Sequence, residues 1–289
     1  MKKIIAIMLA LFTVMLTGCR LFDKEIKDDS DVVTKEYEIS NIDTLNVKDI
    51  NLKQGGTYFG PSVYLCSSDR CYVAIKTNEL INEKIKVECN GSKLNIYGKR
   101  LETYVTKSID IYVYGCTFNN VKLSNVKANV DKASLANDNV DIDLSGACNI
   151  EIQEINCAEL DLGISGATKV NISKLNTSSL NIDSSGASKI EINNLVSNNT
   201  KAYLSGASKL MLNGSTKKGE YHGSGASIFD LKDCKSNDVK IDLSGASDAY
   251  VSFNNLLKGS ISGSSEVTYY GDSNNVDIST SGGSEVKKG

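Results

Sequence analysis

A Ser-Gly motif recurs at an almost constant spacing through the second half of this 289-residue chain. Six copies read Ser-Gly-Ala, and two later copies, at Ser262 and Ser281, keep only Ser-Gly. Successive copies lie 18 to 20 residues apart, and a fixed period of this length is typical of solenoids. The six complete copies, which we interpret as structural corners, begin Ser145-Gly146, Ser165-Gly166, Ser185-Gly186, Ser205-Gly206, Ser224-Gly225 and Ser244-Gly245.

Apolar and polar residues alternate on both sides of each motif. In the second repeat, Leu160, Leu162 and Ile164 precede the serine, and Val170 and Ile172 lie after it. Period two predicts strands with one buried face. Because consecutive repeats are so alike, we expect them to stack in register as rungs of ~20 residues. The sequence therefore predicts an all-β fold, a parallel β-helix.

Each residue of the motif has an expected place at the corner. Glycine is expected where the chain bends with positive φ. We expect alanine on the inside of the bend, where little more than a methyl group fits, and serine on the outside, in a ladder of hydroxyls. A nucleophile elbow is the alternative reading of such a serine. It is disfavoured, because the motif occurs six times and the chain has one histidine, His222.

The first residues predict a signal peptide that directs the protein to the cell envelope. Lys2 and Lys3 precede an apolar run that is short for a membrane span of ~20 residues. The closing "LTGC" resembles the lipobox of bacterial lipoproteins, which implies removal of residues 1–18 and lipidation of Cys19. An ordinary secretory leader ending near Gly18 is the alternative.

Residues 19–35 predict a tether, since they are too polar to be ordered by burial. Their acidic content resembles the stretch behind the lipidated cysteine in surface-exported lipoproteins of the Bacteroides group, although a solvated spacer is an equal alternative. We expect a lipid-anchored envelope protein of the outer membrane, with surface exposure left open.

The regular repeats occupy residues 136–289, and residues 36–135 alternate less clearly. Ser124 and Asn125 occupy the Ser-Gly positions of a degraded corner, 21 residues before Ser145. We interpret 36–135 as irregular opening rungs and a cap, continuous with the solenoid. A separate small β domain is the alternative.

The order of segments in this chain resembles a known family. "LKQGG", then "TNELINEKIKVECNGSKLNIYG", then repeated "LSGAS" is similar to the head-GIN domain of auto-transporter adhesins, over about residues 40–286. That family is largely of unknown function and is common in Bacteroides-type lipoproteins. The resemblance implies a right-handed parallel β-helix and an adhesin-like role. The chain departs from the pattern at "GTYFGPSVYLCSSDRCYVAI", where a longer loop carries two cysteines.

The cysteines predict one disulfide. An envelope location permits such bonds, and Cys66 and Cys71 flank a short turn-like loop. Two free thiols are the alternative. An odd number of cysteines leaves at least one unpaired, and their spacing predicts no metal cluster. Besides Cys19, the cysteines are Cys66, Cys71, Cys89, Cys116, Cys148, Cys157 and Cys234.

Acidic residues recur on the outer face before the corners. Solvated strand faces are the expected role, and calcium bound between rungs is an alternative. Gly163, Lys201 and Lys240 interrupt the acidic columns, which disfavours calcium. The residues are Asp141, Asp143, Asp161, Asp183, Asp242 and Asp277.

The sequence predicts a non-catalytic envelope module that binds a glycan or a protein, with no cofactor. A net charge of −3 gives no attraction to nucleic acid. The nearest approach to a sugar-facing cluster is Tyr203, Tyr221, His222 and Tyr250, although Tyr221 should point inward. The alternative is a polysaccharide-active lyase or hydrolase. Self-association through the C-terminal end of the rod is left open.

Overall fold

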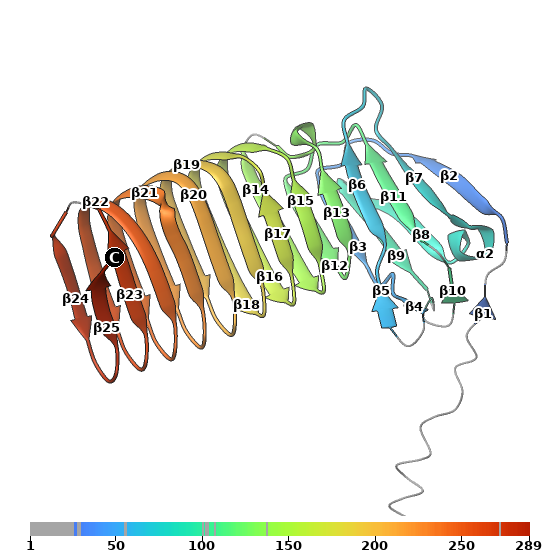
Figure 1. Cartoon of the computed structure of the whole chain (residues 1–289). Coiled ribbons are helices and arrows are strands. Elements are labelled where there is room, and N and C mark those ends of the chain that lie inside the picture. Colours follow the sequence, from blue (N-terminus) through green and yellow to red (C-terminus); the bar gives the residue numbers. More distant parts are fainter. Residues whose placement is uncertain are drawn as a thin grey trace, which may run out of the picture.

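The protein is a long rod of stacked strands (Figure 1). The computed structural model describes residues 26–27, 30–54, 57–99, 101, 104–106, 108–136, 138–271 and 273–289. The predicted signal peptide and Cys19 lie outside the described residues, so lipidation stays a prediction.

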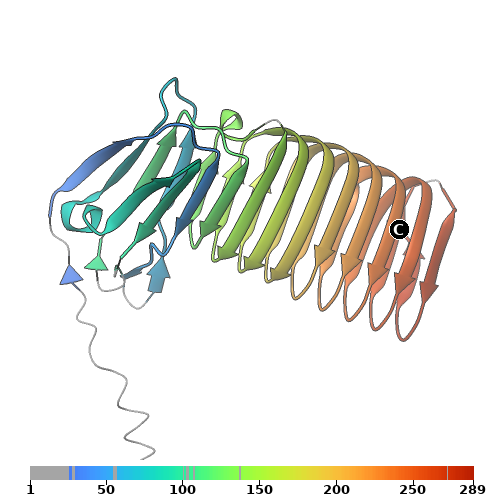
Figure 2. The same cartoon turned by 180° about the vertical axis from the view of Figure 1, so that it is seen from behind.

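The regular part of the rod consists of coils that each contain two strand segments. One segment leads into the Ser-Gly corner and the other leaves it, and an arch at the opposite edge joins one coil to the next (Figures 1 and 2). The strands are β14 (Asn139–Gly146), β15 (Asn149–Ile152), β16 (Ile155–Gly166), β17 (Lys169–Ile172), β18 (Leu175–Gly186), β19 (Lys189–Leu204), β20 (Lys209–Gly223), β21 (Ile228–Leu243), β22 (Asp248–Ile261), β23 (Glu266–Tyr270), β24 (Val276–Thr280) and β25 (Glu285–Lys288).

Neighbouring coils pair in parallel with their repeats in register. Ser145 lies opposite Ser165, which lies opposite Ser185, and Leu162 lies opposite Ile182. The predicted parallel β-helix is confirmed. We call the segments that lead into corners the pre-corner face (β14, β16, β18, the second halves of β19 to β22, and β24). The segments that leave corners form the post-corner face.

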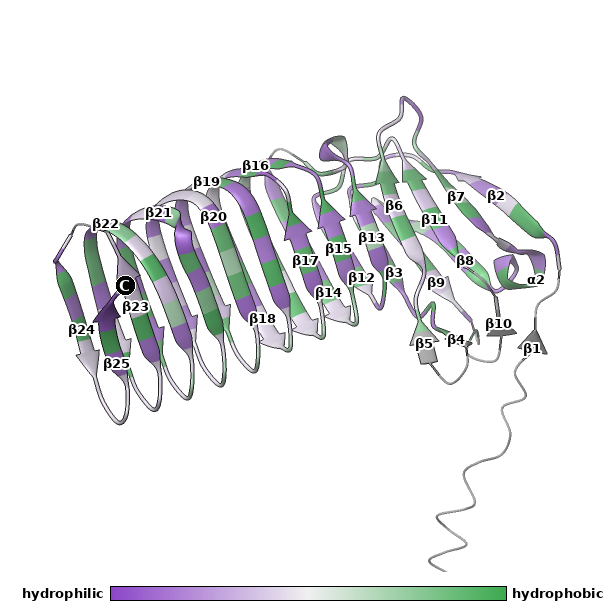
Figure 3. Cartoon of the chain, viewed as in Figure 1, coloured by the Kyte–Doolittle hydropathy of each residue, from purple (hydrophilic) through white to green (hydrophobic). Residues whose placement is uncertain are grey.

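The core lies between the two faces. Inward side chains alternate with outward polar ones, and the alternation appears as bands along the strands in Figure 3. Ile142, Leu162 and Ile182 stack on one another with at most 2% of each exposed. Burying one such side chain contributes ~1.5–3 kcal/mol, so stacks of this kind stabilise the rod.

The N-terminal part extends the same two faces. On the pre-corner side, β14 pairs with β12, β12 with β3, and β3 with β9, all in parallel. On the post-corner side, β15 pairs with β13, β13 with β6, and β6 with β11, also in parallel. These strands are β3 (Thr44–Lys48), β6 (Ser62–Cys66), β9 (Lys93–Gly98), β11 (Asp110–Tyr114), β12 (Asn120–Ser124) and β13 (Lys127–Val130).

Antiparallel strands then end both faces. β8 (Ile85–Asn90) pairs with β9, while β7 (Tyr72–Asn78) lies between β11 and β2 (Val32–Glu38). The short helix α2 (Glu79–Asn82) lies at this end of the rod (Figure 1) and buries Ile81 completely. Short elements complete the fold: β1 (Ile26–Lys27), β4 (Leu52–Gln54), β5 (Thr57–Phe59), β10 (Tyr104–Val105) and the 3₁₀ helix η1 (Lys132–Ser134).

The corners differ in part from the expectation. The glycines do have positive φ, 97° at Gly166 and 103° at Gly186. The alanine prediction is wrong, because Ala167 and its equivalents are exposed. The inside of each bend holds the next residue instead, such as Ser208, whose hydroxyl donates to the Ser205 carbonyl at 3.1 Å.

The corner serines do not form a ladder of hydroxyls. Four of them donate instead to a backbone carbonyl of the preceding coil, as Ser165 does to Leu144 at 3.4 Å; the others are Ser205, Ser244 and Ser262. Corner serines of neighbouring coils are spaced at the strand separation of ~4.8 Å, which is beyond hydrogen-bond distance for two hydroxyls in register. The serines therefore tie the corner of one coil to the backbone of its neighbour.

The predicted Cys66–Cys71 disulfide is wrong. Cys71 is bonded to Cys116, 45 residues away, and Cys66 is free. The physical reason is the antiparallel pairing of β7 with β11, whose last pair is Tyr72 and Tyr114. This pairing brings Cys71 and Cys116 together just beyond the ladder, with their Cα atoms 5.3 Å apart.

Candidate functional site

An outward column of side chains runs along the pre-corner face, two residues before each corner serine. Because the coils are in register, these side chains follow one another at the strand spacing of ~4.8 Å. In order along the rod, the column contains Lys122, Asp143, Gly163, Asp183, Tyr203, His222, Asp242 and Ser260.

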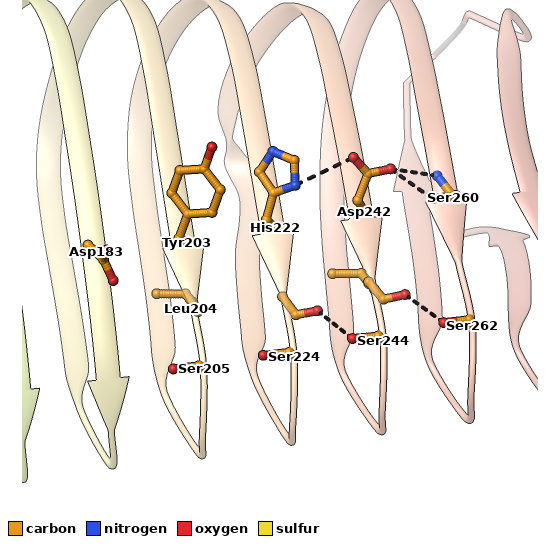
Figure 4. Close-up of a pocket in the computed structure, with 12 residues that line it drawn as sticks. Asp183, Tyr203, Leu204, Ser205, His222, Ser224, Asp242, Ser244, Ser260 and Ser262 are labelled. Atoms are coloured by element: carbon orange, nitrogen blue, oxygen red, sulfur yellow. Dashed lines mark hydrogen bonds and ion pairs between the residues drawn. The ribbon is translucent and has the colours of Figure 1, made fainter.

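Two hollows follow this column. One, of about 720 Å³, extends from Asn46 past Gly163, where a side chain is missing from the column. The other, of about 540 Å³, extends over Tyr203 and His222 to Ser262 (Figure 4). Both are lined by Asp183, so together they form one long depression parallel to the rod, which we call the axial groove.

An aromatic pair lies in the second hollow. The rings of Tyr203 and His222 are stacked, with centroids 4.7 Å apart and planes 12° from parallel. Lys201 places its ammonium group 5.0 Å from the centre of the Tyr203 ring. Tyr203 is nevertheless 42% exposed, so its ring stays accessible to solvent. It is therefore available for contact with a ligand.

Charged groups fix the position of the histidine ring. Its Nε2 lies 2.9 Å from a carboxylate oxygen of Glu220, and its Nδ1 lies 3.5 Å from Asp242. Lys240 contacts both carboxylates at 3.1 Å. The backbone N–H and the hydroxyl of Ser260 also donate to Asp242, at 3.0 and 2.9 Å (Figure 4). The side chains around His222 thus form a preorganised network at the edge of the groove.

The same contacts lower the pKa values of both carboxyl groups. Hydrogen bonds from His222 and then Lys240 lower the pKa of Glu220. Desolvation raises the pKa of Asp242, but hydrogen bonds from Ser260 and Lys240 outweigh it, and the net pKa is lowered. A glycosidase needs one carboxylic acid with a raised pKa, so this pair suits hydrogen-bond acceptance better than proton donation.

The corner serines beside the groove have no activating base. Ser244 and Ser262 donate to the carbonyls of Gly223 and Leu243 at 3.4 Å. Across the described ranges, no serine hydroxyl is hydrogen-bonded to His222, whose two ring nitrogens face carboxylates. A Ser–His nucleophile requires that contact.

Carboxylates of the acidic columns form ion pairs and hydrogen bonds with side chains of neighbouring coils. Asp143 is paired with Lys122, and Asp161 accepts a hydrogen bond from Asn181 at 2.8 Å. In the part of the chain that the structure describes, there is no group of three or more His, Cys, Asp or Glu side chains that could hold a metal ion.

The sequence of this chain matches a family model described as "Putative auto-transporter adhesin, head GIN domain", over residues 59–209 and 162–273. Together these matches cover well over half of the chain. The chain belongs to the head-GIN family. The resemblance inferred from "LKQGG" and the "LSGAS" repeats is therefore confirmed.

Solved structures share the fold of this head-GIN protein. A "putative adhesin" from Parabacteroides merdae aligns with a TM-score of 0.63 at 14% identity, covering 91% of this chain and 98% of the other. From Parabacteroides distasonis, a "putative lipid binding protein" aligns at 0.62 and 18%, and a "putative adhesin" at 0.61 and 14%; each match covers 91% of this chain and 99% of the other. No curated protein matches.

The structure separates the four residues of the predicted sugar-facing cluster. Tyr203 and His222 lie together in the axial groove, but Tyr221 is fully buried against Phe229. Tyr250 lies on the post-corner face, paired with Asp230 and Thr268. Tyr221 is buried because side chains along a strand point alternately inward and outward. Tyr250 lies on the other face because a corner separates its strand segment from the segments of the pre-corner face.

Sequence reasoning missed a second aromatic group. Tyr64 stacks on Tyr112 at 4.7 Å and Tyr72 on Tyr114 at 4.6 Å, on three adjacent strands of the N-terminal part. The alternation of "YVY" shows that Tyr112 and Tyr114 share a face, but only the pairing of β6, β11 and β7 brings the other two beside them.

None of the described helices of this head-GIN protein is long and apolar enough to cross a membrane.

Proposed function

We propose that this head-GIN protein is a non-catalytic, adhesin-like module of the cell envelope that binds an extended glycan along the axial groove. The observation that carries the proposal is the groove itself, which follows one column of side chains over successive coils and has the exposed Tyr203 ring, backed by His222, at its centre. A long shallow site suits a polymer, because contacts add up coil by coil.

The chemistry of the groove favours sugars over an apolar partner. Asp183 and Asp242 offer carboxylate oxygens, which accept hydrogen bonds from hydroxyl groups. The Tyr203 ring offers an apolar surface beside them. Membership of an adhesin family supports a binding role, and the solved relatives described as adhesins support the scaffold.

Attachment to the envelope is part of the proposal. The leader and "LTGC" support removal of residues 1–18 and lipidation of Cys19, with the chain between Cys19 and β2 as the tether. The expected end of the tether at residue 35 is wrong, because β2 begins at Val32 and pairs with β7 from there. Replacing Cys19 with Ser and fractionating the cells tests this. The variant should leave the membrane fraction, and a variant that matures normally and stays equally membrane-bound contradicts the anchor.

The binding site is tested by Tyr203→Ala, with Tyr250→Ala as the matched control on the opposite face. Affinity electrophoresis against a panel of soluble polysaccharides measures binding. We expect Tyr203→Ala to weaken binding about tenfold and the control to leave it unchanged. Equal binding by both variants contradicts the site.

A reducing-end assay on the same polysaccharides separates binding from catalysis. We expect no sugar release. Release that survives repurification and is lost in Glu220→Gln or Asp242→Asn would make the protein a polysaccharide-active enzyme instead.

A further inference from the structure

A separate hollow, of about 550 Å³, lies beside the axial groove on the pre-corner face. Its walls carry four lysines and two carboxylates, Glu220 and Asp238, so its local charge is positive although the chain carries −3. We call it the lysine hollow. The four lysines are Lys201, Lys218, Lys240 and Lys258.

Two of these lysines already have partners. Lys201 lies 3.8 Å from Glu220, and Lys240 lies 3.1 Å from both Glu220 and Asp242. One carboxylate, Glu220, is therefore shared by two ammonium groups and by the His222 ring. It has little negative charge left for a third lysine.

Lys218 and Lys258 have no such partner. Both are exposed, and within the described ranges neither lies within 4.0 Å of a carboxylate oxygen. Asp238 is opposite Lys218 in register, but it accepts a hydrogen bond from Asn255 at 2.6 Å. Asp277 is opposite Lys258 on the next coil without forming an ion pair. Two ammonium groups that form no ion pair thus line one hollow.

The lysine hollow and the axial groove are one continuous surface. Lys201 and Tyr203 are two residues apart on β19, and Lys201 lies over the Tyr203 ring. Lys240 and Asp242 are likewise two apart on β21 and in contact. A strand of polymer that rests on Tyr203 therefore passes within reach of the lysines.

We infer that the lysine hollow binds the carboxylate or sulfate groups of an acidic polysaccharide, so that the ligand of the axial groove is anionic. The inference rests on the proposed function and narrows it. Free ammonium groups on a concave surface attract anions more strongly than on a convex one. A repeating anionic chain also places one charge after another along the coils.

The experiment uses polygalacturonate and dextran sulfate as acidic probes and unmodified dextran as the neutral one, with the purified mature protein. The test variant is Lys218→Gln with Lys258→Gln. The matched control is Lys169→Gln with Lys189→Gln, which removes the same charge from exposed positions on the post-corner face. Affinity is measured at low and at high salt, because salt screens exposed charges.

We expect at least one acidic probe to bind, dextran to bind more weakly, and the test variant to weaken binding of the acidic probe about tenfold at low salt. The control should match the unmodified protein. Equal loss in both variants would mean attraction to overall charge and would overturn the inference.

Other outcomes separate this inference from the proposed function. Binding of dextran as tight as that of the acidic probes, lost in Tyr203→Ala and unchanged in the lysine variants, would overturn the anionic ligand and retain the groove. Capture by phosphatidylglycerol vesicles with no binding of polysaccharide would overturn both in favour of a lipid surface. If none of the probes binds, the proposed function is overturned and this inference with it.

Discussion

The regular coils and the N-terminal part of the rod are stabilised by different kinds of strand pairing. From β14 onward, each coil rests on a nearly identical one, and parallel in-register pairing suffices on both faces. In the N-terminal part, the first coils have no such neighbour on one side. There the chain adds antiparallel strands, the helix α2 and the Cys71–Cys116 disulfide.

This difference teaches where local and long-range interactions stabilise the molecule. A repeat is stabilised by its nearest neighbours, whereas the end of a sheet must be covered or paired to protect its backbone groups. The regular coils should therefore be sensitive to changes in stacking. The N-terminal part should be sensitive to the loss of its long-range link.

The corners also differ between the regular coils and the N-terminal part. In the regular coils, the N–H of Ala167 donates to the carbonyl of Gly146 at 2.9 Å. At the first corner Asn125 replaces the glycine, with φ of 54°, and its side-chain oxygen accepts the N–H of Ala147 at 2.9 Å. Asparagine tolerates this backbone region better than most residues, so one irregular corner can still support the next.

The largest effect is expected from a charge placed in the stack. Leu162→Asp buries a carboxylate between Ile142 and Ile182, and we expect a loss of more than ~4 kcal/mol or local unfolding of the rod. Asp161→Asn, one residue away and facing solvent, should cost less than ~0.5 kcal/mol. Thermal unfolding followed by circular dichroism checks both, and similar melting temperatures would contradict the assignment of faces.

The disulfide tests the other region. Cys116→Ser should destabilise the protein by ~2–5 kcal/mol, since it releases a loop of 45 residues in the unfolded chain. Cys66→Ser, which removes a free thiol, is the control and should be mild. Peptide mapping without reduction should recover Cys71 linked to Cys116, and a Cys66–Cys71 link would refute the pairing.

A smaller effect is expected at a regular corner. Gly166 has φ of 97°, and a Cβ atom there would lie 2.5 Å from the Gly146 carbonyl oxygen. We expect Gly166→Val to cost ~1–3 kcal/mol through backbone strain and this clash. Ser165→Ala loses one long hydrogen bond and should cost under ~1 kcal/mol. If denaturant unfolding ranks Ser165→Ala as the more damaging change, the corner is not under the constraint described.

Several features of the protein followed from the sequence alone. The period of the Ser-Gly motif and the alternation of Leu160, Leu162 and Ile164 predicted the parallel stack, because each coil repeats one local pattern against a copy of itself. The same alternation placed Tyr221 inside. The segments "LKQGG" and "LSGAS" also led to the correct family.

The tertiary structure decided what depends on contacts between unlike segments. Cys71 meets Cys116 because β7 pairs antiparallel with β11, and no local pattern encodes that partner. Ala167 faces solvent because the bend turns one residue later than the sequence suggested. The axial groove and the lysine hollow likewise exist only once register aligns Tyr203 with His222 and Lys201 with Glu220. A periodic sequence determines its own stacking, whereas a binding surface depends on which side chains that stacking brings side by side.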